Sequence, residues 1–209
     1  MARERNSKQR EGNEIEFSRI VAFSDGVFSI AITLLVLNLS IGRHVPSDEV
    51  AQALWDQREN LLAYAISFAV IGRFWLVHHR FFSDVTGFDG RLIALNLLYL
   101  SFIVLIPFSS EVLGDYGGQT PAVALYATNL SAVVLIGMYM SSDARRAGLT
   151  ATDEATHREA KLRSLYIGSV FLVSIPVAFI APGITALLWL VLFFDPAGRY
   201  ASRSAGPRT

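Results

Sequence analysis

Residues 17–39 constrain the fold most, because this stretch is long and apolar enough to cross a lipid bilayer. The stretch reads FSRIVAFSDGVFSIAITLLVLNL and contains one carboxylate, Asp25. An acidic side chain inside a membrane span costs about 3 kcal/mol on insertion scales, so it rarely lacks a role. An aliphatic stripe with a hydroxyl beside it follows at helical spacing, formed by Ile30, Leu34, Leu37 and Thr33. At about 100° per residue, Asp25 lies roughly opposite Ile30, so the helix has one polar anchor and one aliphatic edge.

The composition independently favours a membrane protein. The chain is 52% hydrophobic and 17% charged, whereas soluble domains are about 25% charged. Its charges gather near both ends and between residues 142 and 163, with long apolar runs between them. No cysteine is present, which excludes disulfides, thiolate catalysis and cysteine-ligated metals. The first apolar run has no small-residue cleavage site after it, so we interpret it as a retained span and not as a signal peptide.

The apolar runs predict an all-α, polytopic membrane protein with a single transmembrane domain over residues 1–209. Six spans are expected, at about 17–39, 60–82, 91–113, 120–141, 163–181 and 183–197. Ala181-Pro182-Gly183 separates the last two, because one helix from 163 to 197 would be about 50 Å long and a bilayer core is about 30 Å thick. Pro107 and Pro176 should kink the third and fifth spans.

Arginine and lysine set the expected orientation. With the N-terminus inside, the outer side receives only Arg43 and Arg58, so both termini should be cytoplasmic. A short amphipathic helix is expected on the outer surface within residues 40–59, after Ser47. Thr152-Asp-Glu resembles an N-cap before the fifth span.

The polar residues of the first two spans could form one structural network. Asp25 and Arg73 lie at a similar depth, and His78 lies closer to the cytoplasmic end. The candidate members are Arg19, Ser24, Asp25, Arg73, Trp75 and His78. We expect this network to tie the first helix to the second, with Asp25 paired to an arginine; an ion or proton relay is the alternative. His78 and His79 point about 100° apart and cannot chelate one metal together, so no metal site is expected. Asn38 and Asn96 are expected to make interhelical hydrogen bonds.

Two motifs resemble a known family. Arg19-x-x-x-Phe23-Ser24-Asp25, followed by GVFSIAITLL, resembles the first-helix signature of potassium channels of the transmembrane protein 175 type. RFWLVHHR at residues 73–80 resembles that family's tryptophan and double-histidine helix. Periodicity alone favours ordinary packing for the aliphatic stripe. The resemblance instead implies a homotetramer with the first helices around a central pore and Ile30 as the first constriction, followed by Leu34 and Leu37. Thr33 would add a row of hydroxyls.

The expected function is therefore a potassium-permeable channel of the cell membrane. Its constriction would be hydrophobic, since no Thr-Val-Gly-Tyr-Gly filter is present and Tyr116-Gly117-Gly118 reads as a short outer turn. The expected partners are further copies of the chain, membrane lipid and potassium ions, with no nucleic acid, no cofactor and no enzymatic activity. The first alternative is a proton-coupled transporter that uses Asp25, Arg73 and His78 as a relay. The second is an intramembrane enzyme with a histidine-based site.

Overall fold

The computed structural model describes residues 2–41, 45–151 and 153–189, and in this part of the chain the regular elements are all helices, joined by short connections. An isolated bridge between Val85 and Thr150 is its only extended pairing. Five helical stretches are long and apolar enough to cross a membrane: Glu14–Asn38, Arg58–Asp84, Gly90–Tyr116, Thr120–Arg146 and Glu154–Ala178. The all-α membrane fold class is thus confirmed, and these stretches coincide with the first five predicted spans. The predicted sixth span begins as α8 (Pro182–Leu188), and most of it lies outside the described residues.

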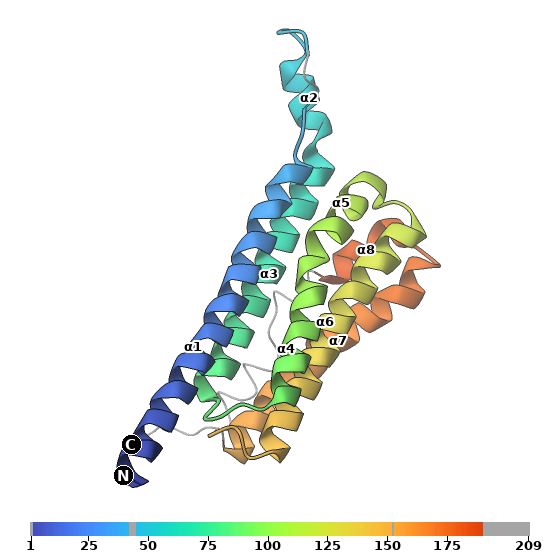
Figure 1. The fold of residues 1–209 in the computed structure, drawn as a ribbon. Helices are drawn as coiled ribbons and strands as arrows, with labels where there is room; N and C mark the ends of the chain where they lie inside the picture. The colour runs from blue at the N-terminus through green and yellow to red at the C-terminus, as the bar shows by residue number, and fades with distance from the viewer. Residues whose placement is uncertain (1, 42–44, 152, 190–209) are drawn as a thin grey trace, which may run out of the picture.

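The first helix is longer than the apolar run that predicts it. α1 (Ala2–Leu34) starts well before Phe17 and continues into a 3₁₀ turn, η1 (Leu35–Asn38). It runs alongside α3 (Arg58–Asp84), and its N-terminal end extends past the other helices (Figure 1). Phe28, Ala31 and Leu35 bury one face of α1 in the main hydrophobic core, which fixes the rotation of the helix about its axis.

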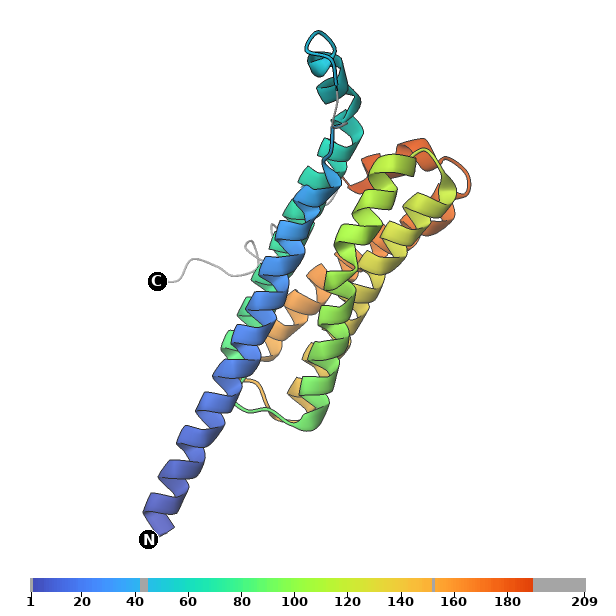
Figure 2. The same cartoon turned by 45° about the horizontal axis from the view of Figure 1, so that its top comes forward.

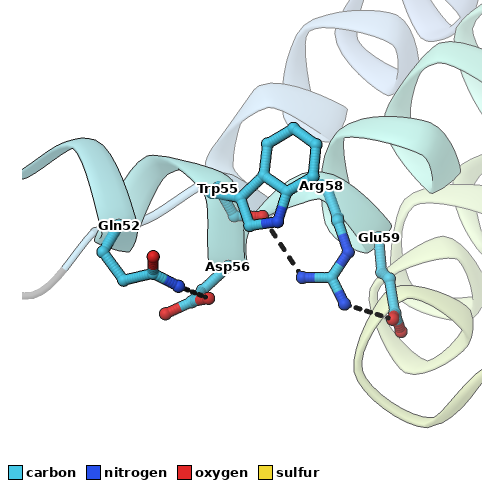
Figure 3. A network of polar contacts seen from close by, with 5 residues as sticks. All are labelled: Gln52, Trp55, Asp56, Arg58 and Glu59. Carbon is cyan, nitrogen blue, oxygen red and sulfur yellow. Dashed lines mark hydrogen bonds and ion pairs between the residues drawn. The ribbon is translucent and has the colours of Figure 1, made fainter.

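A short helix projects at the opposite end of the molecule, as the sequence predicts for the outer surface. α2 (Val50–Asp56) and the start of α3 extend beyond the body of the bundle (Figures 1 and 2). Local contacts hold the junction: Gln52 donates to Asp56 at 2.9 Å, and Arg58 reaches the Trp55 carbonyl and Glu59 (Figure 3).

The third span is broken in two. α4 (Gly90–Val104) and α5 (Ile106–Tyr116) meet at Leu105. Pro107, in the first turn of α5, explains the break, because proline offers no backbone N–H and its ring clashes with the preceding turn. The predicted irregularity at Pro107 is therefore present. The Asn38 side chain donates to the Pro107 carbonyl at 3.0 Å and ties the end of η1 to this break, an interhelical contact of the kind predicted for Asn38.

The remaining helices pack on the far side of α4 and α5. α6 (Thr120–Arg146) lies among α4, α5, α7 (Glu154–Ala178) and α8 (Figure 2). The Asp153 side chain accepts a bond from the Thr156 amide at 2.8 Å and caps α7, as predicted for this segment. α7 runs through Pro176 and ends at Ala178, before α8. Trp189, just after α8, donates to the Ser174 hydroxyl at 2.9 Å.

Candidate functional site: the outer face of α1 and the polar contacts behind it

The aliphatic stripe of α1 is uncovered in the single chain. Ile30 is 59% exposed, Leu34 37% and Leu37 70%. Side chains of this size are normally buried, and a run of them on one helix face points to an interaction surface or a membrane-facing one. The opposite face is closed, since Leu35 is fully buried and Ile32 packs against the core. The stripe therefore faces away from the body of its own chain.

Thr33 lies on the same open face and offers an acceptor to it. Its hydroxyl donates to the Ile30 carbonyl at 2.9 Å within the helix. Because the only hydroxyl proton is used in that bond, the oxygen lone pairs remain available to a cation or a water molecule. The aliphatic face thus carries one oxygen per chain at the level between Ile30 and Leu34.

Asp25 pairs with tryptophan and not with arginine. The indole nitrogen of Trp75 donates to an Asp25 carboxylate oxygen at 2.9 Å, and the Trp75 ring stacks on His79 with centroids 5.5 Å apart. This contact joins α1 to α3, as the sequence predicts for Asp25. Trp75 is partly exposed, so the contact lies at the margin of the bundle.

A second contact chain lies deeper and joins three helices. The Asn96 amide of α4 donates to the Ser24 hydroxyl of α1 at 2.9 Å, and its oxygen lies 2.8 Å from the His78 Nε2 of α3. An amide oxygen only accepts, so His78 must carry its proton on Nε2 and donate it. All three side chains are buried. The interhelical bonding predicted for Asn96 is confirmed, and it makes Asn96 the link between two of the predicted network residues.

Aromatic rings enclose His78 on its other sides. The imidazole lies 5.3 Å from Phe28, 4.6 Å from Phe82 and 5.5 Å from Tyr99, measured between ring centroids. The enclosure holds the ring in one orientation and excludes water from its hydrogen bond.

The two predicted arginines stay outside both contacts. Arg19 and Arg73 are exposed, and neither has a hydrogen bond or ion pair among the described residues. Helix geometry explains this, because Arg73 lies about 200° round α3 from Trp75, which faces Asp25. The expected Asp25–arginine pair is thus not formed within one chain.

Sequence reasoning missed a further polar cluster in the half of the bundle nearer to α2. The Ser67 hydroxyl lies 2.8 Å from Ser110 and 2.9 Å from the Tyr126 hydroxyl, and all three are buried. Serines are too common in membrane helices for the sequence to single these out. Close by, the Asn129 amide donates to Ser109 at 3.2 Å. Among the described residues, no group of three histidine, cysteine or acidic side chains is placed to hold a metal.

Comparison with known proteins identifies relatives of the whole chain. Residues 19–107 match the family described as the endosomal/lysosomal potassium channel TMEM175. A potassium channel of Streptomyces collinus is 34% identical over 190 residues, covering 83% of this chain and 91% of that protein. The crystal structure of a lysosomal potassium-selective channel TMEM175 homolog from Chamaesiphon minutus superposes with a TM-score of 0.72 at 29% identity. That match covers 91% of this chain and 99% of the other.

Animal relatives match about half of the chain. The endosomal/lysosomal proton channel TMEM175 of Gallus gallus is 36% identical over 110 residues, which are 49% of this chain and 22% of that protein. The bacterial relatives match over most of their length and the structural neighbour shares the fold. The members of this family are ion channels and not enzymes. The chain belongs to the TMEM175 family of membrane channels.

Proposed function

We propose that this protein is a potassium-permeable channel in which four copies of the chain place α1 around a central pore. The observation that carries the proposal is the open aliphatic face of α1, with Ile30, Leu34 and Leu37 exposed while the opposite face is packed into the core. A single helix cannot enclose a pathway, so the face requires further copies of the chain. The potassium channels among the relatives support the choice of ion.

The constriction would be hydrophobic. Rings of branched aliphatic side chains at Ile30, Leu34 and Leu37 exclude water when narrow and admit it after a small outward tilt of the helices. The Thr33 oxygen, with its proton held by the Ile30 carbonyl, would face the ion between two aliphatic rings. Selectivity would then depend on the width of the constriction and on these oxygens.

The polar contacts behind α1 would hold the pore-lining helix in register. Asp25–Trp75 anchors it to α3, and Ser24–Asn96–His78 anchors it to α3 and α4. Arg19 and Arg73 have no polar partner among the described residues of one chain, so in the assembly they would contact other copies, lipid headgroups or water. Four of the six predicted network residues, Ser24, Asp25, Trp75 and His78, thus contribute to two separate contacts behind α1.

The proposed orientation places both termini in the cytoplasm of a cell whose outer membrane face carries α2. Arg80, Arg91, Arg145 and Arg146 lie on the loops and helix ends at the inner side. On the outer side the described residues hold Arg58, which contacts Glu59. This asymmetry follows the positive-inside rule.

Proton permeation is a second candidate, because the animal relatives are named proton channels. A relay through Asp25, Arg73 and His78 would need a continuous path of polar contacts. His78 instead bonds to Asn96 and is shielded by aromatic rings, and Asp25 bonds to Trp75. A proton pathway through the water in the α1 pore is therefore a better candidate than this relay.

The deciding experiment is single-channel recording of purified protein in planar bilayers, with potassium on one side and sodium on the other. We expect discrete current steps and a reversal potential displaced towards potassium. Light scattering in detergent should return the mass of four chains. Saturating flux that requires a proton gradient would favour a transporter, and a monomer at micromolar concentration would contradict the pore.

Cysteine scanning tests the lining directly, because the chain has no native cysteine. Cysteine at 30, 34 or 37 should react with water-soluble thiol reagents and block the current. Cysteine at 32 or 35 should not react, since these positions face the core. Ile30→Asn or Leu34→Ser should wet the constriction, raise conductance and admit sodium. Unchanged fluxes in both variants would show that the stripe is ordinary packing.

A further inference from the structure

The exposed positions of α1 extend beyond the aliphatic stripe and follow a seven-residue repeat. Alternating steps of three and four residues connect a set that we call the heptad seam, in which every residue is exposed: Glu16, Arg19, Phe23, Gly26, Ile30, Thr33 and Leu37. The seam contains three successive repeats of seven residues, and this is the spacing at which helices wind around a common axis. The exposed face is wider than the seam, but the seam runs through its full length.

Side-chain size changes sharply along the heptad seam. Phe23 is 55% exposed, and its ring contacts no other aromatic ring among the described residues. Gly26, about 4.5 Å further along the helix, has no side chain. Apart from the backbone of its own helix, a Cβ atom built on Gly26 would meet no atom of the described residues within 4 Å, so the space directly in front of it is open in the single chain. Ile30 follows about 6 Å beyond.

A recess lies beside Phe23. It measures about 320 Å³ and is lined by Glu16, Arg19, Ile20, Phe23, Ile93, Asn96 and Leu97, between α1 and α4. The Phe23 ring can point along the heptad seam or into the recess. A rotation about χ1 moves the ring from one position to the other. Asn96 forms part of the wall of the recess. Its hydrogen bonds to Ser24 and His78 hold this part of the wall in place.

We propose that Phe23 forms a second, cytoplasmic-side constriction of the pore, and that Gly26 opens a chamber between it and Ile30. The inference rests on the proposed function, since it requires α1 to line the pore. The chamber would hold a hydrated monovalent cation between two apolar rings. Glu16 and Arg19 would form the polar entrance below Phe23, and rotation of the phenyl ring into the recess would open the constriction.

The test uses access to a cysteine in the chamber. Gly26→Cys is introduced alone and together with Phe23→Ala, in the full chain reconstituted in bilayers. The probe is methanethiosulfonate ethyltrimethylammonium, a membrane-impermeant cation, applied from the cytoplasmic side. If Phe23 guards the chamber, Phe23→Ala should speed modification of the cysteine by about tenfold or more, because a ring of phenyl groups is removed from the path. Single-channel conductance should also rise in Phe23→Ala and fall in Phe23→Trp.

Two controls keep the outcomes separate. Glu16→Cys, outside the proposed constriction, should react at the same rate with Phe23 or Ala at position 23. Leu37→Cys, treated from the outer side, reports whether α1 lines the pore at all. If Leu37→Cys is blocked and the Gly26→Cys rate is independent of position 23, the proposal fails while the channel function stands. If neither cysteine affects the current, both fail. Should Phe23→Ala not assemble, Phe23→Leu serves in its place, with Phe68→Ala, an exposed residue of α3, as the assembly control.

Discussion

α1 and α7 are both poorly covered by the rest of the chain, yet their open faces differ in chemistry. In the most apolar stretch of 18 residues of each helix, 22% of the residues are buried in the first span and 17% in α7. The exposed large residues of α7 within the membrane are apolar, such as Leu165, Leu172 and Val173, and no charged residue occurs from 164 to 178. The open face of α1 instead carries charged side chains, a glycine and a hydroxyl in addition to its aromatic and aliphatic side chains.

Exposure alone therefore does not distinguish a lipid-facing helix from a pore-facing one. Lipid solvates apolar side chains well and charged ones poorly, so the face of α7 fits lipid. A face with Glu16, Arg19 and Thr33 fits a surface that other copies of the chain and water share. α6 is the best covered of the three helices. It lies among four other helices, and half of its most apolar stretch is buried.

The largest expected effect comes from placing a lysine on each open face. Val173→Lys puts a charge against lipid, which costs about 3 kcal/mol at the centre of a span. We expect a loss of folded protein on the order of a hundredfold, measured by fluorescence-detected size exclusion. Ile30→Lys should assemble with near-normal yield, because its side chain reaches water in the pore, but it should abolish cation current.

Val173→Leu and Ile30→Leu are the matched controls and should express like the original protein. The assignment of α7 to lipid and of α1 to a watered interface would be contradicted if Ile30→Lys is lost from the membrane while Val173→Lys is tolerated. That result would place lipid against α1 and the assembly interface against α7.

A smaller effect is expected behind α1. Asn96→Leu keeps the size of the side chain but leaves the buried His78 N–H without an acceptor. It also removes the bond that the Ser24 oxygen accepts, while the Ser24 proton stays bonded to the Ile20 carbonyl. An unsatisfied buried group costs about 1–3 kcal/mol. We expect a lower thermal midpoint in detergent and, if the proposed tetramer forms, weaker assembly of it. Leu97→Ala, exposed on the same helix, should leave the midpoint unchanged; equal loss in both variants would remove any special role from the Asn96 contacts.

The sequence predicts the spans better than the contacts between them. Span positions depend on long apolar runs, and the break at Pro107 depends on the missing N–H of one residue, so both are local properties. Partner choice is not local. Asp25 bonds to Trp75 because α3 turns that residue towards α1 and Arg73 away from it, and that rotation is set by the burial of Phe74, Ile71 and His78. For the same reason the sequence predicts that Asn96 bonds between helices but does not identify its partners, Ser24 and His78.

Two glycines offer a finer comparison of α1 with α7. A Cβ on Gly168 of α7 would lie 3.1 Å from the Val134 side chain of α6, whereas a Cβ on Gly26 of α1 meets nothing within 4 Å. Gly168→Val should therefore overpack the α6–α7 contact and destabilise the protein by about 1–2 kcal/mol. Gly26→Val should leave the thermal midpoint unchanged. A loss of stability in Gly26→Val would place a neighbouring copy of the chain, and not open space, in front of this position.

The smallest effect concerns the start of α7, which has a side-chain cap outside the membrane. Asp153 accepts bonds from the Thr156 amide at 2.8 Å and from its hydroxyl at 2.9 Å, and these bonds lower the pKa of the carboxyl group below its usual value. A carboxylate with a lowered pKa contributes stability above its unfolded pKa, and this contribution is lost as the pH falls through the folded value. Asp153→Ala should lower the midpoint by about 2 °C near neutral pH, and Asp153→Asn, which also caps helices, by less. Under acid conditions the difference in thermal midpoint between the original protein and Asp153→Ala should shrink. The difference in midpoint between Asp153→Asn and Asp153→Ala should not change with pH. A constant difference between Asp153 and Ala across this range would mean that the carboxylate charge has no part in holding the start of α7.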